Sequence, residues 1–594
     1  MDNRRPALAP AFRTLPEYVR HWAETTPDRR ALTFVDHPAP NSRGVHRTLT
    51  WRRLDLRIRA VAARLAAETE PGSRVALLCP QGTDYVTAFL GALAAGLVAV
   101  PLYPPGLPGQ GDRLSAVLTD ASPSVVVTTS HHLAEVSELC ANAQTKVIAV
   151  DQVPDAAADG WRASVPPDAE AVAYLQYTSG STRTPAGVEI THANVVANAR
   201  QALAAYGADT HPVTCVGWLP LYHDMGLVLS VAAPVVRGLL SVLMDPVAFL
   251  HEPVRWLRLL ATHQRALSAA PNFAYDYCAS TVTEAQKADL RLDGVFALIN
   301  GSEPVRAGTA DRFHGAFAAQ GVVPETHCPS YGLAEATVFV SAARPGKPFG
   351  RFALDRDALA AGKALPARPD DPRAVLLVGC GTPAGQRVRI VDPVTRVALE
   401  EGEVGEIWVQ GPNVGRGYRN QERETQGVFG AVFADADADA DAGAGAATGR
   451  GGTWLRTGDL GTVLDGQLVV TGRLKDLIVV DGRNHYPQDV EATAQDAHPA
   501  VRRDRLAAFG VQGGSGERVV VVAEHVRNVP LADIDVPALV RTVRAAVSAR
   551  HGLRLSDVVL VAPGTVPRTS SGKVSRALTR ERYLAGAYAA GAVG

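Results

Sequence analysis

The sequence predicts an α/β fold in which helices cover mainly parallel β-sheets, with a large domain followed by a small one. Two observations lead to this prediction. The chain has 594 residues, which exceeds the size at which a single hydrophobic core stops growing. From about residue 48, amphipathic helical segments alternate with short apolar strands, a pattern typical of parallel sheets with helices on both faces.

This alternation is clearest between residues 54 and 151. Helices are expected over 54–66 and 85–95, where apolar side chains recur at helical spacing. Strands are expected over 74–80, 98–104, 124–129 and 146–151. The uncharged stretch 86–103 is long enough to span a bilayer, but Gly96 and Pro101 divide it into a helix and a strand. We therefore expect a buried α/β unit there and no transmembrane segment.

The composition is that of a globular protein, with 46% hydrophobic and 20% charged residues. The net charge of −1 produces no global field that would attract nucleic acid, so no nucleic-acid partner is expected. The six cysteines lack the paired spacing of a zinc site or a disulfide framework, and the first 15 residues lack the apolar run of a signal peptide. Both features favour a cytoplasmic protein.

Two segments are irregular. Residues 434–452 form a low-complexity Asp/Ala/Gly run, which predicts a mobile surface loop in preference to a docking tail. Residues 351–373 predict a short helix with a proline-rich exit, which interrupts the passage into an apolar strand at 374. The strand and helix signals after "TGDLG" suggest a separate small domain, and a boundary near Leu474 gives domains over 1–474 and 475–594.

The strongest local signal is the loop "YTSGSTRTPAGV" at 177–188, placed between an apolar strand and a helix expected near Thr191. Such a loop directs backbone N–H groups and hydroxyls toward a phosphate. It is not a Walker loop, which requires Gly-Lys-Ser/Thr at its end, whereas here Gly187 lies between Ala186 and Val188. The expected phosphate-binding residues are Thr178, Ser179, Gly180, Ser181, Thr182 and Arg183.

This loop resembles the phosphate loop of the adenylate-forming enzymes, which include acyl-CoA ligases, nonribosomal-peptide adenylation domains and fatty acyl-AMP ligases. The family's other motifs follow in order: "WLPLYHDMGL" at 218–227, "NGSEPV" at 300–305, "SYGLAEAT" at 330–337, "GEIWVQGPNVGRGY" at 405–418, "WLRTGDLG" at 454–461, "GRLKDLIVVDGRNHYPQDVE" at 472–491 and "PRTSSGKVSR" at 567–576. The resemblance covers nearly the whole chain. It implies a large N-terminal domain with a β-barrel-like subdomain, a small mobile α+β C-terminal domain, and ATP and Mg²⁺ as cofactors.

The resemblance also implies roles for single residues in nucleotide binding. Tyr331 is similar to the aromatic residue that packs on adenine, and Asp459 and Arg473 are similar to the ribose contacts. Glu335 resembles the family's magnesium carboxylate, a role suited to hard cations that bridge phosphates, and Thr178 is the second expected magnesium ligand. The remaining expected nucleotide contacts are Gly301, Ser302, Glu303, Gly332 and Ala334.

Three further residues are implied to act in catalysis and domain motion. His223, with Asp224 beside it, lies where the family lines the passage between the nucleotide and acyl sites. Lys573, one of only six lysines, resembles the lysine that bridges the acyl carboxylate and the α-phosphate. Lys475 occupies the family's hinge position, where rotation swings the small domain away after the first half-reaction.

Several features favour the fatty acyl-AMP ligase branch. Arg183, Ala186 and Ala334 depart from most acyl-CoA ligases in a manner usual for this branch, and Arg183 is the candidate cation for the β- and γ-phosphates. The segment 351–373 resembles the insertion that distinguishes the branch. We expect its apolar residues to pack on the large domain, and Arg356 and Asp357 to bond across the gap to the small domain and so disfavour CoA. The apolar residues are Phe352, Leu354, Leu359 and Leu365.

The implied reaction is activation of a fatty acid as its acyl-adenylate, followed by transfer to the phosphopantetheine thiol of an acyl carrier protein of a polyketide or peptide synthase. The chain ends at Gly594 without a carrier domain, so we expect a separate carrier protein. Two alternatives are a long-chain acyl-CoA ligase and a non-catalytic adenylate-binding scaffold. The joint presence of Glu335, Asp459, Arg473 and Lys573 argues against the scaffold.

Overall fold

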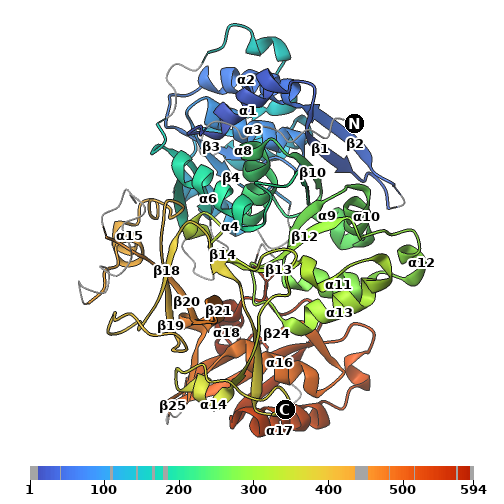
Figure 1. Cartoon of the computed structure of the whole chain (residues 1–594), viewed down its shortest axis with the longest axis vertical. Helices are drawn as coiled ribbons and strands as arrows, with labels where there is room; N and C mark the ends of the chain where they lie inside the picture. Colours follow the sequence, from blue (N-terminus) through green and yellow to red (C-terminus); the bar gives the residue numbers. More distant parts are fainter. Residues whose placement is uncertain are drawn as a thin grey trace.

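The computed structural model shows a large N-terminal part and a smaller C-terminal part at opposite ends of the long axis (Figure 1). It describes residues 11–40, 42–106, 111–141, 145–162, 168–177, 185–434, 452–480, 482–513, 516–569 and 573–588. The sequence predicted the α/β class correctly. Among the described residues, no helix combines the length and apolar character needed to cross a bilayer.

The first sheet has six strands in the order β6-β5-β3-β4-β7-β8, and all neighbours are parallel except β7 and β8. These strands are Lys146–Ala149, Val125–Thr128, Arg74–Leu77, Val98–Pro101, Val172–Tyr177 and Gly187–Thr191. The helices that follow them include α3 (Thr83–Ala94), α4 (Gly111–Ala121) and α5 (Leu133–Cys140). Residues Tyr85 to Ala94 of α3 are all buried, which confirms that the uncharged stretch near residue 90 forms core.

The second sheet has nine strands in the order β17-β14-β13-β12-β11-β9-β10-β1-β2, and its central strands are parallel. In that order the strands are Thr382–Pro383, Ser341–Ala342, His327–Tyr331, Val295–Asn300, Ala266–Ala270, Thr214–Gly217, Leu240–Met244, Arg30–Asp36 and Val45–Thr50. One continuous apolar cluster extends through both sheets and the helices α1 (Leu15–Thr25), α2 (Trp51–Ala66), α3 and α6 (His192–Ala205). The two sheets therefore share a core and form one rigid base for the loops at their strand ends.

The phosphate-loop region contains the expected strand, β7, and the helix expected near Thr191, α6, together with strand β8, which was not expected. Strand β8 pairs antiparallel with β7. Helix α6 begins only after β8, where Thr191 caps it by accepting a hydrogen bond from the Asn194 N–H at 3.1 Å.

A four-stranded antiparallel sheet, in the order β18-β19-β20-β21, follows the large sheets and corresponds to the expected barrel-like subdomain. Its strands are Arg387–Val391, Gly405–Gln410, Leu455–Leu464 and Gln467–Arg473. Before it, strands β15 (Arg351–Asp355) and β16 (Ala374–Val378) form a hairpin that carries the short helix α14 (Arg356–Ala360). The sequence predicted the helix in this insertion but not the strand β15.

The C-terminal part has its own apolar core, formed by strands and helices after residue 477. Its main sheet has the order β24-β25-β26, with strands Val501–Gly513, Gly516–His525 and Leu555–Val561. Helices α16 (Pro487–Ala497), α17 (Val536–His551) and α18 (Arg576–Leu584) pack around it, and a small hairpin, β22 (Ile478–Val480) with β23 (Arg483–His485), precedes it. Lys475 lies in the single helical turn Leu474–Asp476 that joins this part to β21.

The insertion contacts both parts of the molecule. Leu354 and Leu359 are buried in a cluster with Leu460 of β20 and Tyr486 of the C-terminal part, and Phe352 is packed against it. The prediction for Leu365 is wrong, because its side chain is 52% exposed. Figure 1 shows α14 beside the C-terminal elements at the lower end of the molecule. The insertion therefore bridges the sheet β18–β21 and the C-terminal part.

Candidate active site

The candidate site lies where strand ends of the nine-stranded sheet meet strands β20 and β21. A cavity of about 30 Å³ opens there, and two of the motifs supply much of its lining. The lining residues from these motifs are Gly301, Ser302, Ser330, Tyr331 and Gly332. Gly301 follows β12, and Tyr331 ends the neighbouring parallel strand β13. Ligands of parallel sheets bind at such carboxyl ends, so the fold agrees with the position of the motifs.

Close backbone packing shapes this corner. A Cβ atom on Gly332 would lie 1.6 Å from the carbonyl oxygen of Val338, so only glycine fits at this position. Ser302 and Thr337 adopt positive φ angles of 70° and 69°, which are uncommon for residues with side chains. Backbone strain of this kind persists only where the surroundings hold it, and it is enriched at functional sites.

The ribose-side residues form a hydrogen-bonded group. Asp459 of β20 and Arg473 of β21 are directly paired in the strand register, and Arg473 Nε donates to Asp459 Oδ1 at 2.9 Å. Tyr331 donates its hydroxyl to the other carboxylate oxygen, also at 2.9 Å. Burial, with the carboxylate of Asp459 nearby, raises the pKa of Tyr331 well above its usual range, so the phenol stays protonated and remains a donor. Three residues that the resemblance assigned to nucleotide binding are thus in mutual contact.

Glu335 lies in a single helical turn after Leu333 and its carboxylate is held by a tyrosine. Tyr418 donates its hydroxyl to Glu335 Oε1 at 2.7 Å, and the Gly415 N–H donates to the Glu335 carbonyl at 2.8 Å. Burial raises the pKa of Glu335, while the bond from Tyr418 lowers it. The sequence reasoning did not single out Tyr418, although it lies in the quoted motif "GPNVGRGY". The segment that contains Gly415 and Tyr418 therefore positions Glu335, the candidate metal ligand.

The residues present are compatible with magnesium bound partly through a nucleotide. Mg²⁺ is commonly held by one or two carboxylates together with substrate phosphates, and Glu335 supplies such a carboxylate. Among the described residues there is no group of three or more His, Cys, Asp or Glu side chains suited to a metal held by protein alone. The second expected ligand, Thr178, lies outside the described residues.

Lys573 is brought to this site from the C-terminal part. Burial lowers the pKa of Lys573, and Arg473 lowers it further, while Glu303, Asp224 and Asp459 raise it. The Thr569 N–H donates to the Lys573 carbonyl at 2.8 Å, and Arg568 pairs with Val574 in an isolated antiparallel bridge. The ammonium group of Lys573 therefore interacts electrostatically with charged residues of the N-terminal part.

Glu303, in the loop after β12, and Asp224, the first residue of the short helix α7 (Asp224–Leu227), both act electrostatically on Lys573. The Phe273 N–H donates to Glu303 at 2.7 Å, and burial raises the pKa of Glu303. Asp224 lines the cavity, and its Oδ1 lies 2.6 Å from His223 Nδ1. Burial raises the pKa of Asp224, but His223, the Met225 N–H and Lys573 together outweigh that effect and leave the pKa below its usual range. The expected pair His223–Asp224 is thus in contact, with Asp224 on the cavity side.

Some expected residues lie elsewhere or cannot be placed. The phosphate-loop residues Thr178, Ser179, Gly180, Ser181, Thr182 and Arg183 lie outside the described residues, as does most of the expected loop at 434–452. Ala334 is buried beside Glu335. Tyr206, which also lines the cavity, was not expected, because a lone tyrosine on a buried helix carries no sequence signal.

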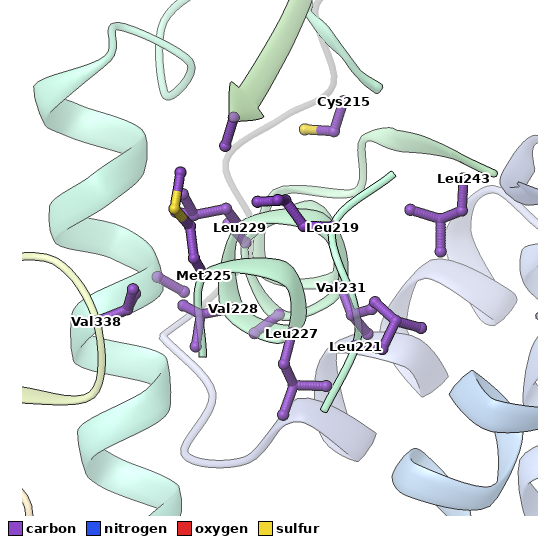
Figure 2. Packing of buried hydrophobic residues seen from close by; sticks show 14 of the residues in the cluster. Cys215, Leu219, Leu221, Met225, Leu227, Val228, Leu229, Val231, Leu243 and Val338 are labelled. Atoms are coloured by element: carbon purple, nitrogen blue, oxygen red, sulfur yellow. The ribbon is translucent and has the colours of Figure 1, made fainter. Parts of the chain in front are cut away.

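The apolar side of the cavity is formed by side chains around a π-helical turn. Met225 and Leu229 line the cavity together with Val338 and Phe339, and residues Val228–Ala232 form the π-helix. Figure 2 shows Met225, Leu229 and Val338 within the packed apolar cluster around this helix. π-helical turns are rare and often occur at functional sites. One cavity therefore has a polar side made by the motifs and an apolar side made by this helix.

Comparison with known proteins agrees with this geometry. The family model described as AMP-binding enzyme matches residues 19–419, and the model for the AMP domain of Disco-interacting protein 2-like proteins matches residues 475–592. The long-chain-fatty-acid–AMP ligase FadD26 of Mycobacterium marinum is 41% identical, over 96% of this chain and 97% of its own. FadD32 of Mycolicibacterium smegmatis is also 41% identical, over 97% and 95%.

Solved structures show the same likeness. A fatty acyl-adenylate ligase of L. pneumophila, in complex with acyl adenylate and pyrophosphate, superposes with a TM-score of 0.73 at 33% identity, covering 97% of this chain and 96% of its own. A structure from work on fatty acyl-adenylate ligases of E. coli and L. pneumophila gives a TM-score of 0.83 at 31% identity, covering 98% and 99%. Fold and site together define an adenylate-forming enzyme. The chain belongs to the AMP-binding enzyme family and, within it, to the fatty acyl-AMP ligases.

Proposed function

We propose that this protein joins a fatty acid to AMP with MgATP and then transfers the acyl group to the phosphopantetheine thiol of a separate acyl carrier protein. The observation that carries the proposal is the position of Lys573. The ammonium of Lys573, from the C-terminal part, interacts electrostatically with Asp459, Arg473 and Glu303 of the motifs. A scaffold that only binds adenylate has no need of a lysine that a second domain brings into the site.

In the first half-reaction, a carboxylate oxygen of the fatty acid attacks the α-phosphorus and pyrophosphate leaves. Asp459 accepts hydrogen bonds from the ribose hydroxyls, and Tyr331 packs on the adenine. Lys573 bridges the acyl carboxylate and the α-phosphate and balances the negative charge that develops there. Magnesium, when bound at Glu335, neutralises phosphate charge and so assists departure of pyrophosphate.

In the second half-reaction, the thiol sulfur attacks the acyl carbonyl and AMP leaves as the thiol proton is lost. In the proposed adenylating conformation, the ammonium of Lys573 lies beside the adenylate. We propose that rotation at Lys475 removes it and admits the thiol. The separate core of the C-terminal part supports this proposal, because that core can move as a unit.

The insertion restrains that rotation. Arg356 of α14 donates two bonds to Asp489 of α16, at 2.8 Å and 3.1 Å, and a third to the Arg550 carbonyl at 3.2 Å. Asp357 lies 3.5 Å from Arg483. The expectation that Arg356 and Asp357 bond across to the small domain is confirmed. We propose that this restraint disfavours CoA, whereas a carrier protein supplies binding energy from its own surface to release it.

The apolar side of the cavity is the proposed acyl site. Its present volume of about 30 Å³ holds roughly one water molecule, so an acyl chain enters only if side chains around the π-helix move. One relative, the 4-hydroxyphenylalkanoate adenylyltransferase of Mycobacterium tuberculosis, is 40% identical over 96% of this chain and 92% of its own. An aryl-alkanoic acid is therefore the second candidate substrate.

One competition experiment tests these proposals. The enzyme receives ATP, Mg²⁺, a mixture of fatty acids and a 4-hydroxyphenylalkanoic acid, with CoA and holo-carrier protein both present, and mass spectrometry identifies every acyl product. The expected products are fatty acyl-AMP and acyl-carrier protein, with little acyl-CoA. Dominant acyl-CoA formation would instead identify a long-chain acyl-CoA ligase, and the absence of any adenylate would support a scaffold.

A further inference from the structure

An ion pair outside the insertion also joins the two parts of the molecule. Arg306 Nη1 of the N-terminal part lies 2.7 Å from Asp504 Oδ1 of the C-terminal part, and 198 residues separate the two in sequence. The side chains are 31% and 30% exposed. Arg306 comes three residues after Glu303, one of the groups that face Lys573, and it immediately precedes helix α13 (Ala307–Phe317).

The backbone holds both partners in place. The Arg306 N–H donates to Asn272 Oδ1 at 3.1 Å, and the Asp504 N–H donates to Gln495 Oε1 at 3.0 Å. Asp504 has a φ angle of 54°, in the left-handed region, at an irregularity of the β24–β25 ladder between Val501 and Leu506. Such a conformation is strained for a residue other than glycine, and a bulge redirects a side chain away from the strand. Here the strained residue is the one that reaches across to the N-terminal part.

The pair belongs to the same conformation as the engaged lysine. Asp504 and Lys573 lie in the C-terminal part, whereas Arg306 and Glu303 lie in one loop of the N-terminal part. Any rotation at Lys475 that withdraws Lys573 from Glu303 also moves Asp504 away from Arg306, because Lys573 and Asp504 lie in the same part. A 2.7 Å ion pair does not survive displacement by several ångströms.

We propose that Arg306 and Asp504 form a domain clamp that holds the C-terminal part in the adenylating position and opens for thiol transfer. This inference rests on the proposed function, because it assigns the pair to one of its two half-reactions. Both are positioning residues: they act through Lys573 and do not contact substrate. The clamp is distinct from the insertion, which reaches the C-terminal part at Asp489 and Arg550.

The clamp predicts opposite effects on the two half-reactions. Asp504→Asn keeps the shape of the side chain but removes its charge. We expect its rate of acyl-adenylate formation, measured as pyrophosphate release, to fall about twofold to fivefold, as is typical of a partly exposed ion pair. KM for ATP should stay unchanged. Transfer from preformed acyl-adenylate to pantetheine should be as fast as in the wild type or faster. Arg306→Gln should behave in the same way, and the exchanged pair Arg306→Asp with Asp504→Arg should recover adenylation.

The matched control is Arg503→Gln. Arg503 is the neighbour of Asp504, and its ion pair with Asp496, at 2.6 Å, lies wholly within the C-terminal part. Both rates should match the wild type in this variant. Equal losses of both half-reactions in Asp504→Asn, or no loss of adenylation, would overturn the clamp.

A distance measurement separates this proposal from the proposed function. All six native cysteines are buried, so cysteines introduced at exposed Val323 and Arg541 accept spin labels selectively. With no substrate present, Asp504→Asn should shift the distance distribution away from that of the wild type, whereas Arg503→Gln should not. An unchanged distribution would overturn the clamp even if the enzyme forms adenylate. A shifted distribution in a protein that forms no adenylate would support the clamp and contradict the proposed function.

Discussion

Removing the Arg356 side chain tests whether the insertion restrains the small domain. In Arg356→Ala, Asp489 loses two hydrogen bonds and the Arg550 carbonyl loses one, all contributed by a residue that is only 9% exposed. Breaking a buried ion pair costs about 3–5 kcal/mol, and exposed pairs contribute about 0–1 kcal/mol. The Arg356 side chain is 10% exposed and the Asp489 side chain 19%, so a cost of about 2 kcal/mol is reasonable.

That free energy has a defined consequence for the products. Because about 1.4 kcal/mol corresponds to a factor of ten, about 2 kcal/mol shifts the balance between restrained and released domain roughly 30-fold. The ratio of acyl-CoA to acyl-AMP at saturating CoA should rise by up to that factor, while pyrophosphate release changes by less than about threefold. Deletion of residues 351–373 should raise the ratio in the same direction.

Two comparisons make the result specific to the pair. Arg368→Ala removes an ion pair within the insertion whose partners are 85% and 71% exposed, and it should leave the ratio unchanged. Combining Arg356→Ala with Asp489→Ala should add little to the single change if the pair is the source of the effect. An unchanged product ratio in a folded Arg356→Ala protein would refute the restraint.

Three further predictions follow from the site and its histidines. Lys573→Ala should slow acyl-adenylate formation about 10²–10³-fold, with the ATP affinity measured by calorimetry nearly unchanged. The control Lys347→Ala, at an exposed lysine, should leave both the rate and the affinity intact. Pyrophosphate release at the wild-type rate in Lys573→Ala would exclude Lys573 from the mechanism. Lys475→Pro should leave adenylation measurable but suppress transfer to a carrier thiol, because proline fixes φ near about −65°; equal loss of both steps would indicate misfolding. Burial lowers the pKa of His551 to about 4, below its ordinary 6.5, so its contribution to stability is complete above pH 6.5 and lost as pH falls toward 4. The free energy of unfolding should therefore decline as pH falls from 6.5 to about 4. His551→Gln should reduce the slope of the free energy of unfolding against pH by up to about 1.4 kcal/mol per pH unit. An unchanged slope would show that His551 titrates normally.

The sequence predicted the parts of the fold that depend on local pattern. The strands and helices between residues 51 and 149 lie close to their predicted positions, because continuous apolar runs and helical periodicity survive in the buried sheet. Strand β15 was missed because "RFALDRDALA" carries alanine and leucine at helical spacing. Its strand conformation depends on pairing with β16, about 20 residues later, which no local pattern encodes.

Sequence reasoning was similarly limited at the site. The motifs contained Asp459 and Arg473, but only the strand register of β20 and β21 shows that they are direct partners. Tyr418 lay inside a quoted motif and went unnoticed, since nothing local links it to Glu335, 83 residues away. Arg306 and Asp504 carried no signal at all. Contacts between distant segments decide these roles, and a single sequence does not contain them.

The chemistry of the contacts between the two parts suits an enzyme with two half-reactions. The larger part and the C-terminal part each keep their own apolar core, and large apolar interfaces resist separation. Between them lie a small apolar cluster that includes Leu359 and Tyr486, and the ion pairs Arg306–Asp504 and Arg356–Asp489. The charged partners of these pairs regain solvation by water when they part. Each pair therefore favours one position without making it permanent. Adenylation needs Lys573 inside the site and thiol transfer needs it outside, so a purely apolar interface would stabilise the first step at the expense of the second.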